Sequence, residues 1–246
     1  MLLHSLPKPR LLLVASVASF GSALIYDYSI VVVNQPERAM KRFINTTSDS
    51  DELTNNDTGT EDPDADPMSK AELRNFWNLY VSSLFLGHFL SNFLLGNVLD
   101  RVGRVRGLLL AFSLGVLGNL LQSSVQWHAA YQWLFVGRCF CGIGGGMARA
   151  TSGIFITEIS PDSIRATMYS ILAWTSAMFI AVPAVLGAHN VFGTPRIWYL
   201  LFLMPSVLGA FTMFVIWLAA EESPKYVLYR GRASKESEEE ARRIRA

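Results

Sequence analysis

Residues 96–104, GNVLDRVGR, stand between two strongly apolar stretches of the chain. This segment combines one aspartate, two arginines and two glycines. Glycine permits tight turns, and the forked guanidinium of arginine binds carboxylates and helix ends. Charge is avoided inside lipid, so we place the segment in a short loop between two membrane-spanning helices. Similar charged clusters recur in EISPDSIRA (158–166) and EESPK (221–225), which suggests one repeated structural role.

The composition of the whole chain supports a membrane protein. Of 246 residues, 51% are hydrophobic and 17% are charged, whereas soluble domains average about a quarter charged. The apolar residues gather in blocks of the length that crosses a bilayer, about 20 residues. We therefore predict an all-α membrane protein with six transmembrane helices, at roughly 11–33, 75–98, 107–125, 131–157, 167–188 and 197–219. A net charge of +1 without a basic domain gives no sign of nucleic-acid binding. No catalytic grouping is recognisable, so we expect no enzyme activity, cofactor or metal.

The distribution of lysine and arginine predicts the orientation, because short cytoplasmic loops are enriched in them. Basic residues gather in the leader, in the loops 98–106 and 158–166, and after residue 220, while the loop 123–130 has none. Both termini are predicted to be cytoplasmic, and we expect the plasma membrane as the location. The expected organisation is a cytoplasmic leader, a six-helix bundle and a cytoplasmic tail that begins an inter-half connector, at 1–10, 11–219 and 220–246 respectively.

The segment 34–74 is then an external loop. It is rich in Asp, Asn, Thr, Ser and Pro, so we expect it to be mobile. It contains two sequons, Asn45-Thr46-Thr47 and Asn56-Asp57-Thr58, both on the predicted outer side. We therefore predict glycosylation at Asn45 or Asn56.

Four motifs resemble a known family. The pattern G-x-x-x-D-R-x-G-R in residues 96–104 is similar to the signature loop of the major facilitator superfamily. The spacing Phe140-x-Gly142-Ile143-x-x-Gly146, then Phe155-x-x-Glu158 and Arg165, resembles its sugar-porter branch. Glu222-Ser223-Pro224-Lys225 resembles a motif of that branch that follows the sixth helix. Residues 20–47 resemble the first helix and external loop of facilitative hexose transporters, above all the fructose-transporter class.

This resemblance implies a gate on the cytoplasmic side. In the family, charges at the inner ends of the helices form a network that holds the outward-open state, and breaking it favours the inward-open state. Contacts made in one state and lost in the other bias such an equilibrium. By position, the expected members are Arg104, Glu158, Arg165, Glu222 and Lys225, with Asp100 and Arg101 in support.

The resemblance also implies substrate-lining positions. Tyr26 stands where fructose-type carriers place a sugar-lining tyrosine, and Tyr28 is a second candidate on the same helix. The fifth-helix glutamine of hexose transporters becomes Ala173, and Ile25 and Ser29 replace amides on the first helix. These changes weaken the expectation of hexose specificity, because a lost hydrogen-bonding group lowers discrimination.

Asp27 is an ionisable residue inside the first span, and such residues are costly and often functional. From the predicted outer ends of spans 1 and 4, Asp27 and Arg138 lie at similar depths of about 9 and 10 Å. We predict that Asp27 lies closer to Arg138 than to Arg149, which is near the inner end. A structural ion pair is favoured over a proton-binding site.

The family's full transporter has twelve spans in two halves, and this chain resembles the first half. We expect transport of a sugar or related polyol by alternating access, with a second six-helix half or a homodimer completing the site. We favour a truncated half. One alternative is a proton-coupled sugar symporter, and another is a non-transporting membrane partner or sensor.

Overall fold

The computed structural model describes residues 9–55, 69–128, 130–188 and 191–230. Helices dominate these ranges, in the order α1 (Pro9–Ile25), α2 (Asp27–Val31), α3 (Glu37–Asn55), α4 (Lys70–Val102), α5 (Arg104–His128), α6 (Gln132–Ile159), α7 (Arg165–Leu186), α8 (Leu200–Ala219) and α9 (Pro224–Arg230). Six helical segments in the described ranges are long and apolar enough to span a membrane, the first of them Pro9–Val31. The predicted all-α fold with six transmembrane helices is confirmed.

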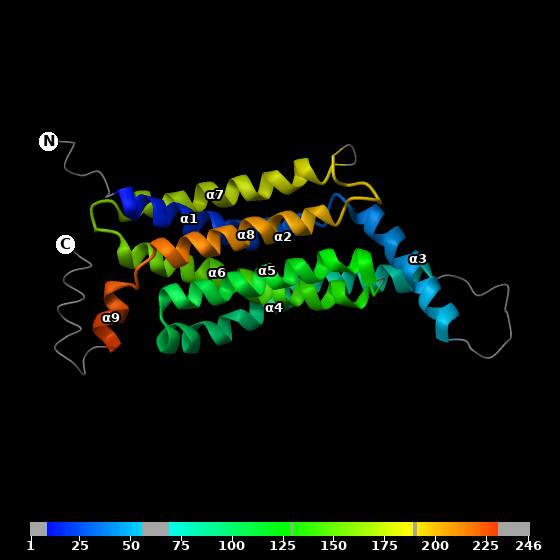
Figure 1. Ribbon diagram of the computed structural model, residues 1–246, viewed down its shortest axis with the longest axis horizontal. Helices are drawn as coiled ribbons and strands as arrows, with labels where there is room; N and C mark the ends of the chain where they lie inside the picture. The colour runs from blue at the N-terminus through cyan, green and yellow to red at the C-terminus, as the bar shows by residue number, and fades with distance from the viewer. Residues whose placement is uncertain (1–8, 56–68, 129, 189–190, 231–246) are drawn as a thin grey trace.

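The spanning helices run side by side along the long axis of the molecule (Figure 1). Helix α3 lies at one end of this bundle and α9 at the other, and we call these the α3 end and the α9 end. Helix α6 packs against α4 and α5, while α1 packs against α6, α7 and α8. Sequence segments 96–104, 158–166 and 221–225 therefore meet at the α9 end.

Glycines on α6 allow close contact with its neighbours. A Cβ added at Gly142 would collide with the Leu84 carbonyl oxygen and lie 2.9 Å from the Cα of Gly87 on α4. A Cβ at Gly144 would collide with the backbone nitrogen of Gly115 on α5. Small residues let helix backbones approach closely in lipid, where water supplies no hydrophobic driving force. Larger side chains at these positions would push α4 and α5 away from α6.

The first span is interrupted at Tyr26, five residues before its end at Val31. Helix α1 ends at Ile25 and α2 begins at Asp27, with Tyr26 between them. The interruption lies against α6, because a Cβ added at Gly145 would be 3.3 Å from the Ile25 carbonyl oxygen and from the Tyr26 Cα. Asp27 is buried at this point and Tyr26 is half-buried.

Part of the segment predicted as a mobile external loop is helical instead. In α3, Met40 and Ile44 are fully buried, and the ring of Phe43 lies 5.4 Å from that of Trp198. These apolar positions recur every three to four residues, so one face of the helix covers the end of the bundle. The polar composition of 34–74 hid this short amphipathic pattern.

Candidate functional site

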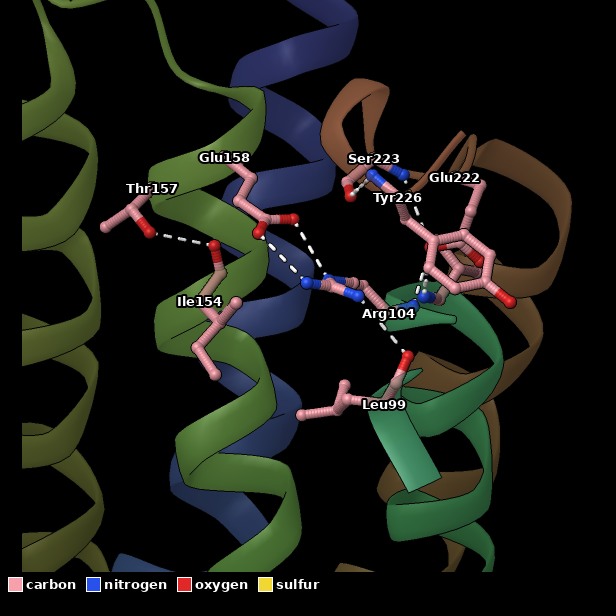
Figure 2. A network of polar contacts seen from close by, with 9 residues as sticks. Leu99, Arg104, Ile154, Thr157, Glu158, Glu222, Ser223 and Tyr226 are labelled. Carbon is pink, nitrogen blue, oxygen red and sulfur yellow. Dashed lines mark hydrogen bonds and ion pairs between the residues drawn. The ribbon is translucent and has the colours of Figure 1, made fainter. Parts of the chain in front are cut away.

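The first charged cluster joins α5 to α6 at the α9 end (Figure 2). Arg104 begins α5, and its Nε and Nη2 donate to the two carboxylate oxygens of Glu158 at 3.1 and 3.3 Å. Arg104 Nη1 also donates to the Leu99 carbonyl oxygen at 3.3 Å. Both charged side chains are largely buried, so this forked pair holds the end of α6 against the α4–α5 turn.

Glu222 connects the segment before α9 to the same turn. Its Oε1 accepts hydrogen bonds from the backbone N–H groups of Arg104 at 2.7 Å and Val105 at 3.0 Å. It also accepts from the backbone N–H of Ser223 at 3.2 Å. The first N–H groups of a helix lack partners within the helix, and its N-terminus attracts negative charge. Glu222 thus caps α5 from a distant part of the chain.

Gly103 makes this capping geometry possible. Its φ of +100° is a conformation that side chains rarely adopt, and a Cβ there would lie 2.6 Å from Glu222 Oε2. Tyr226 on α9 closes the turn, since its hydroxyl donates to the Arg101 carbonyl oxygen at 3.1 Å. The Arg104 guanidinium lies 5.5 Å from the centre of the Tyr226 ring. Aromatic and carboxylate groups therefore hold Arg104 from two sides (Figure 2).

The other charged residues predicted for this network are placed differently. Arg165 pairs with Asp162 and donates to the Thr157 and Ser160 carbonyl oxygens, which ties the α6–α7 turn together. Within the described ranges, Asp100 and Lys225 form no ion pair with the cluster. Arg101 contributes through its backbone carbonyl oxygen. The structure thus joins Arg104, Glu158 and Glu222 directly and leaves Asp100, Lys225 and the Arg101 side chain outside.

A second polar cluster lies at the interruption of the first span. The Tyr26 ring stacks on the imidazole of His88 from α4, with centroids 4.5 Å apart. A Cβ at Gly145 would lie 3.3 Å from His88 Nε2, so these two rings meet α6 at that level. We call Tyr26, Asp27, His88, Arg149 and Ser176 the central polar cluster.

Arg149 links three elements in this cluster. Its Nη1 lies 3.6 Å from Asp27 Oδ2. The same nitrogen donates to the Ser176 hydroxyl and, at 3.5 Å, to the Leu172 carbonyl oxygen, both on α7. A single guanidinium therefore connects α2, α6 and α7 next to Tyr26.

The predicted pair of Asp27 with Arg138 is wrong, because Asp27 faces Arg149. Arg138 and Arg149 are eleven residues apart, which places them within about 20° of each other on one face of α6. Their positions along the helix axis therefore determine which of them meets Asp27. Asp27 follows Tyr26, which is level with Gly145. Arg138 is about 10 Å further toward the α3 end, and Arg149 is about 6 Å toward the α9 end. Helical side chains tilt toward the N-terminus, so Arg149 reaches toward Asp27 while Arg138 points away from it.

Arg138 is instead enclosed between α4 and α6. It is fully buried, with its guanidinium 5.4 Å from the centre of the Tyr80 ring. Its Nε and Nη1 have no hydrogen-bond partner among the residues that the structure describes. A cation over an aromatic ring is partly stabilised in this position.

The candidate substrate-lining residues separate into two groups. Tyr26 is half-buried in the central polar cluster, and Ala173 is exposed on α7. Tyr28 is fully buried in the bundle, and its hydroxyl donates to the Leu201 carbonyl oxygen at 2.8 Å. The prediction that Tyr28 lines the substrate is therefore wrong. The pattern placed two tyrosines on one helix, and only packing showed that they point in different directions.

Other features escaped the sequence reasoning or lie beyond the structure. Arg10 pairs with Glu221 at 2.7 Å, an exposed contact between the start of α1 and the segment that follows α8. The partnership of Arg149 with Ser176 had no signal in the local sequence, because it joins two helices. Asn45 is a half-buried residue of α3, whereas Asn56 and the tail after residue 230 lie outside the described residues.

The sequence of the chain is similar to those of known transporters. Residues 14–246 match the family described as "Sugar (and other) transporter". The chain is 30% identical over 224 residues to facilitated glucose transporter member 4 of Bos taurus, covering 90% of this chain and 42% of that protein. It is 23% identical over 237 residues to member 5 of Equus caballus, with coverages of 96% and 45%. The chain thus spans less than half the length of these relatives.

Solved structures show the same fold. The chain superposes on the major facilitator superfamily proton:xylose symporter XylE with a TM-score of 0.71 and 18% identity, covering 95% of this chain and 49% of that one. The partially occluded inward-open form of XylE from E. coli gives a TM-score of 0.69 and 19% identity, with coverages of 95% and 54%. At this identity the comparison establishes the fold of a six-helix half.

Proposed function

Because the chain belongs to the sugar (and other) transporter family, we propose that it forms one half of a membrane carrier for a sugar or related polyol. The carrier works by alternating access and carries out no chemical conversion. The observation that carries this proposal is the Arg104–Glu158–Glu222 cluster, which joins α5, α6 and the segment before α9 at one end of the bundle. The relatives of this chain that are named as glucose transporters support a sugar as the substrate.

The cluster acts as one side of a gate. An ion pair present in one conformation and absent in another shifts the balance between them. Arg104 and Glu158 are largely buried, so the loss of one partner leaves the other charge uncompensated. In carriers of this architecture the substrate lies between two halves. The working carrier therefore needs a second six-helix half or a second copy of this chain.

Uptake into lipid vesicles tests the proposal. We expect labelled D-glucose or D-fructose to enter vesicles that contain this chain joined to a second six-helix half. Glu158→Gln should shift the carrier toward the state open at the α9 end and slow net uptake. Asp100→Asn is the matched control, because Asp100 is exposed and outside the cluster. Absence of uptake by every such assembly, or equal effects of the two variants, would count against this function.

The orientation of the carrier follows from its basic residues. Arg101, Arg104 and Arg106 at the α9 end support a cytoplasmic location for that end. Helix α3 then lies outside the cell, where Asn45 is glycosylated. The carrier itself lies in the plasma membrane. Glycosidase treatment should increase the electrophoretic mobility of the wild-type chain. The variants Asn45→Gln and Asn56→Gln, alone and together, show which sequon is glycosylated. If glycosidase treatment changes the electrophoretic mobility of neither the wild-type chain nor these variants, the result opposes this orientation.

The central polar cluster supports a second candidate, a proton-coupled symporter. Asp27 lies 3.6 Å from Arg149 at the start of α2, so protonation of the carboxyl group would release the guanidinium. Uptake by such a symporter rises with external acidity. This dependence of uptake on acidity should disappear in Asp27→Asn. If the protein is a facilitative carrier, uptake depends on acidity neither in the wild type nor in Asp27→Asn.

A further inference from the structure

Arg149 is partly exposed on one face of the bundle. Arg149 lies ten residues before the end of α6, about 15 Å along the helix, yet its side chain is 31% exposed. A guanidinium at that depth is not presented to lipid, because intramembrane charges face protein or water. The exposed side chains of α8, such as Phe211, Phe214 and Trp217, are apolar and suit lipid contact instead. The Arg149 face is therefore one that meets water or protein rather than lipid.

Arg149 has donors available on that face. Its polar contacts with Asp27, Ser176 and Leu172 all use Nη1. Within the described part of the chain, Nε and Nη2 form no hydrogen bond. These two nitrogens have the fixed spacing that matches the two oxygens of a carboxylate. The contact to α7 holds the guanidinium in place, so a ligand would meet an already oriented fork.

The charge balance of the bundle interior favours an anion. Among the described residues of the spanning helices, three charged side chains lie away from the helix ends: Asp27, Arg138 and Arg149. One negative and two positive charges leave an excess of +1. The Asp27 side chain is 8% exposed, against 31% for Arg149, so the accessible surface is positive. Ala173 and Ala177, close to Ser176 along α7, are exposed and offer only methyl groups.

We propose that the central polar cluster binds a sugar or polyol that carries a carboxylate, and that Arg149 selects it over the neutral analogue. This inference rests on the proposed carrier function and narrows its substrate class. The carboxylate binds Nε and Nη2 of Arg149, and the stacked rings of Tyr26 and His88 lie alongside. Charge-assisted forked contacts are the strongest recognition that the cluster offers.

D-Glucuronate and D-glucose form a matched pair of probes, since they differ only in a carboxylate against a hydroxymethyl group. Binding of each labelled probe is measured to the chain in lipid nanodiscs. We expect D-glucuronate to bind at least about tenfold more tightly, as one charge-assisted contact would give. Arg149→Gln should bring the ratio to about one, and Arg149→Lys should retain part of it. Arg106→Gln, at an exposed position near the start of α5, should leave the ratio unchanged.

A folding control keeps the test decisive. Arg149→Gln leaves Asp27 without its neighbour, so the double variant Asp27→Asn/Arg149→Gln, which carries no charge at this pair, is measured as well. Equal binding of the two probes, binding of neither, or a preference that survives in the folded double variant would overturn the inference. Uptake in vesicles separates the two proposals. Uptake of D-glucose but not D-glucuronate leaves the carrier function standing, whereas tight D-glucuronate binding without any uptake refutes the carrier function alone.

Discussion

Glu222→Ala is the sharpest test of how the α9 end is held together. The variant removes the acceptor of the Arg104 and Val105 N–H groups at the start of α5. Loss of a helix cap costs about 1 kcal/mol, and loss of a negative charge at a helix N-terminus costs up to about 1 kcal/mol more. We expect the free energy of unfolding to fall by about 2 kcal/mol. That is roughly a 30-fold change in the folding equilibrium constant.

The neighbouring glutamate supplies the control. Glu221 pairs with Arg10 at 2.7 Å, but the two side chains are 50% and 61% exposed. Exposed ion pairs contribute little, so Glu221→Ala should cost less than about 0.5 kcal/mol. Glu222→Gln keeps an acceptor and loses the charge, and it should fall between the two alanine variants. Each protein is unfolded with denaturant in micelles and followed by tryptophan fluorescence. Equal losses in Glu222→Ala and Glu221→Ala would refute the capping role.

Three further outcomes are expected, each measured by the same unfolding assay. Gly103→Ala should lower the free energy of unfolding by about 1–3 kcal/mol because of its φ of +100°, whereas Gly96→Ala, in open space, should be neutral or stabilising. Gly142→Ala should cost about 1–3 kcal/mol by forcing α4 from α6, and a Gly153→Ala variant with its nearest atom at 3.6 Å should not. Tyr28→Phe should cost about 1 kcal/mol through the lost bond to the Leu201 carbonyl oxygen, with probe binding unchanged. Equal effects within either glycine pair, or a loss of probe binding in Tyr28→Phe, would contradict these assignments.

The Arg104–Glu158–Glu222 cluster was the part of the site most accessible to sequence reasoning. Arg104, Glu158 and Glu222 belong to short motifs at helix ends, and the order of the six spans predicts that these ends lie on the same side of the bundle. The contacts around these residues were harder to predict from the sequence. Tyr226 contacts a backbone carbonyl group, and the side chain of Lys225, which was expected in the network, is exposed to solvent. A motif identifies which residues gather at one end. It does not determine which atoms touch.

The central polar cluster shows why the rest was out of reach. Depth along two helices, counted from predicted ends, placed Asp27 beside Arg138. The structure places Asp27 beside Arg149, because the tilt of side chains toward the helix N-terminus adds to the difference in depth. Tyr26 and Tyr28 are only two residues apart, yet one faces the cluster and the other is buried against α8.

By itself, the sequence determined the six spans, the all-α fold and the set of charges at one end of the bundle. These features follow from runs of apolar residues, from the thickness of a bilayer and from the exclusion of charge from lipid. The tertiary structure decided the partners: Glu222 as the cap of α5, α3 as a cover, and Arg149 as the link between α2, α6 and α7. These contacts join residues distant in the chain, and only packing fixes the depth and rotation of one helix against another.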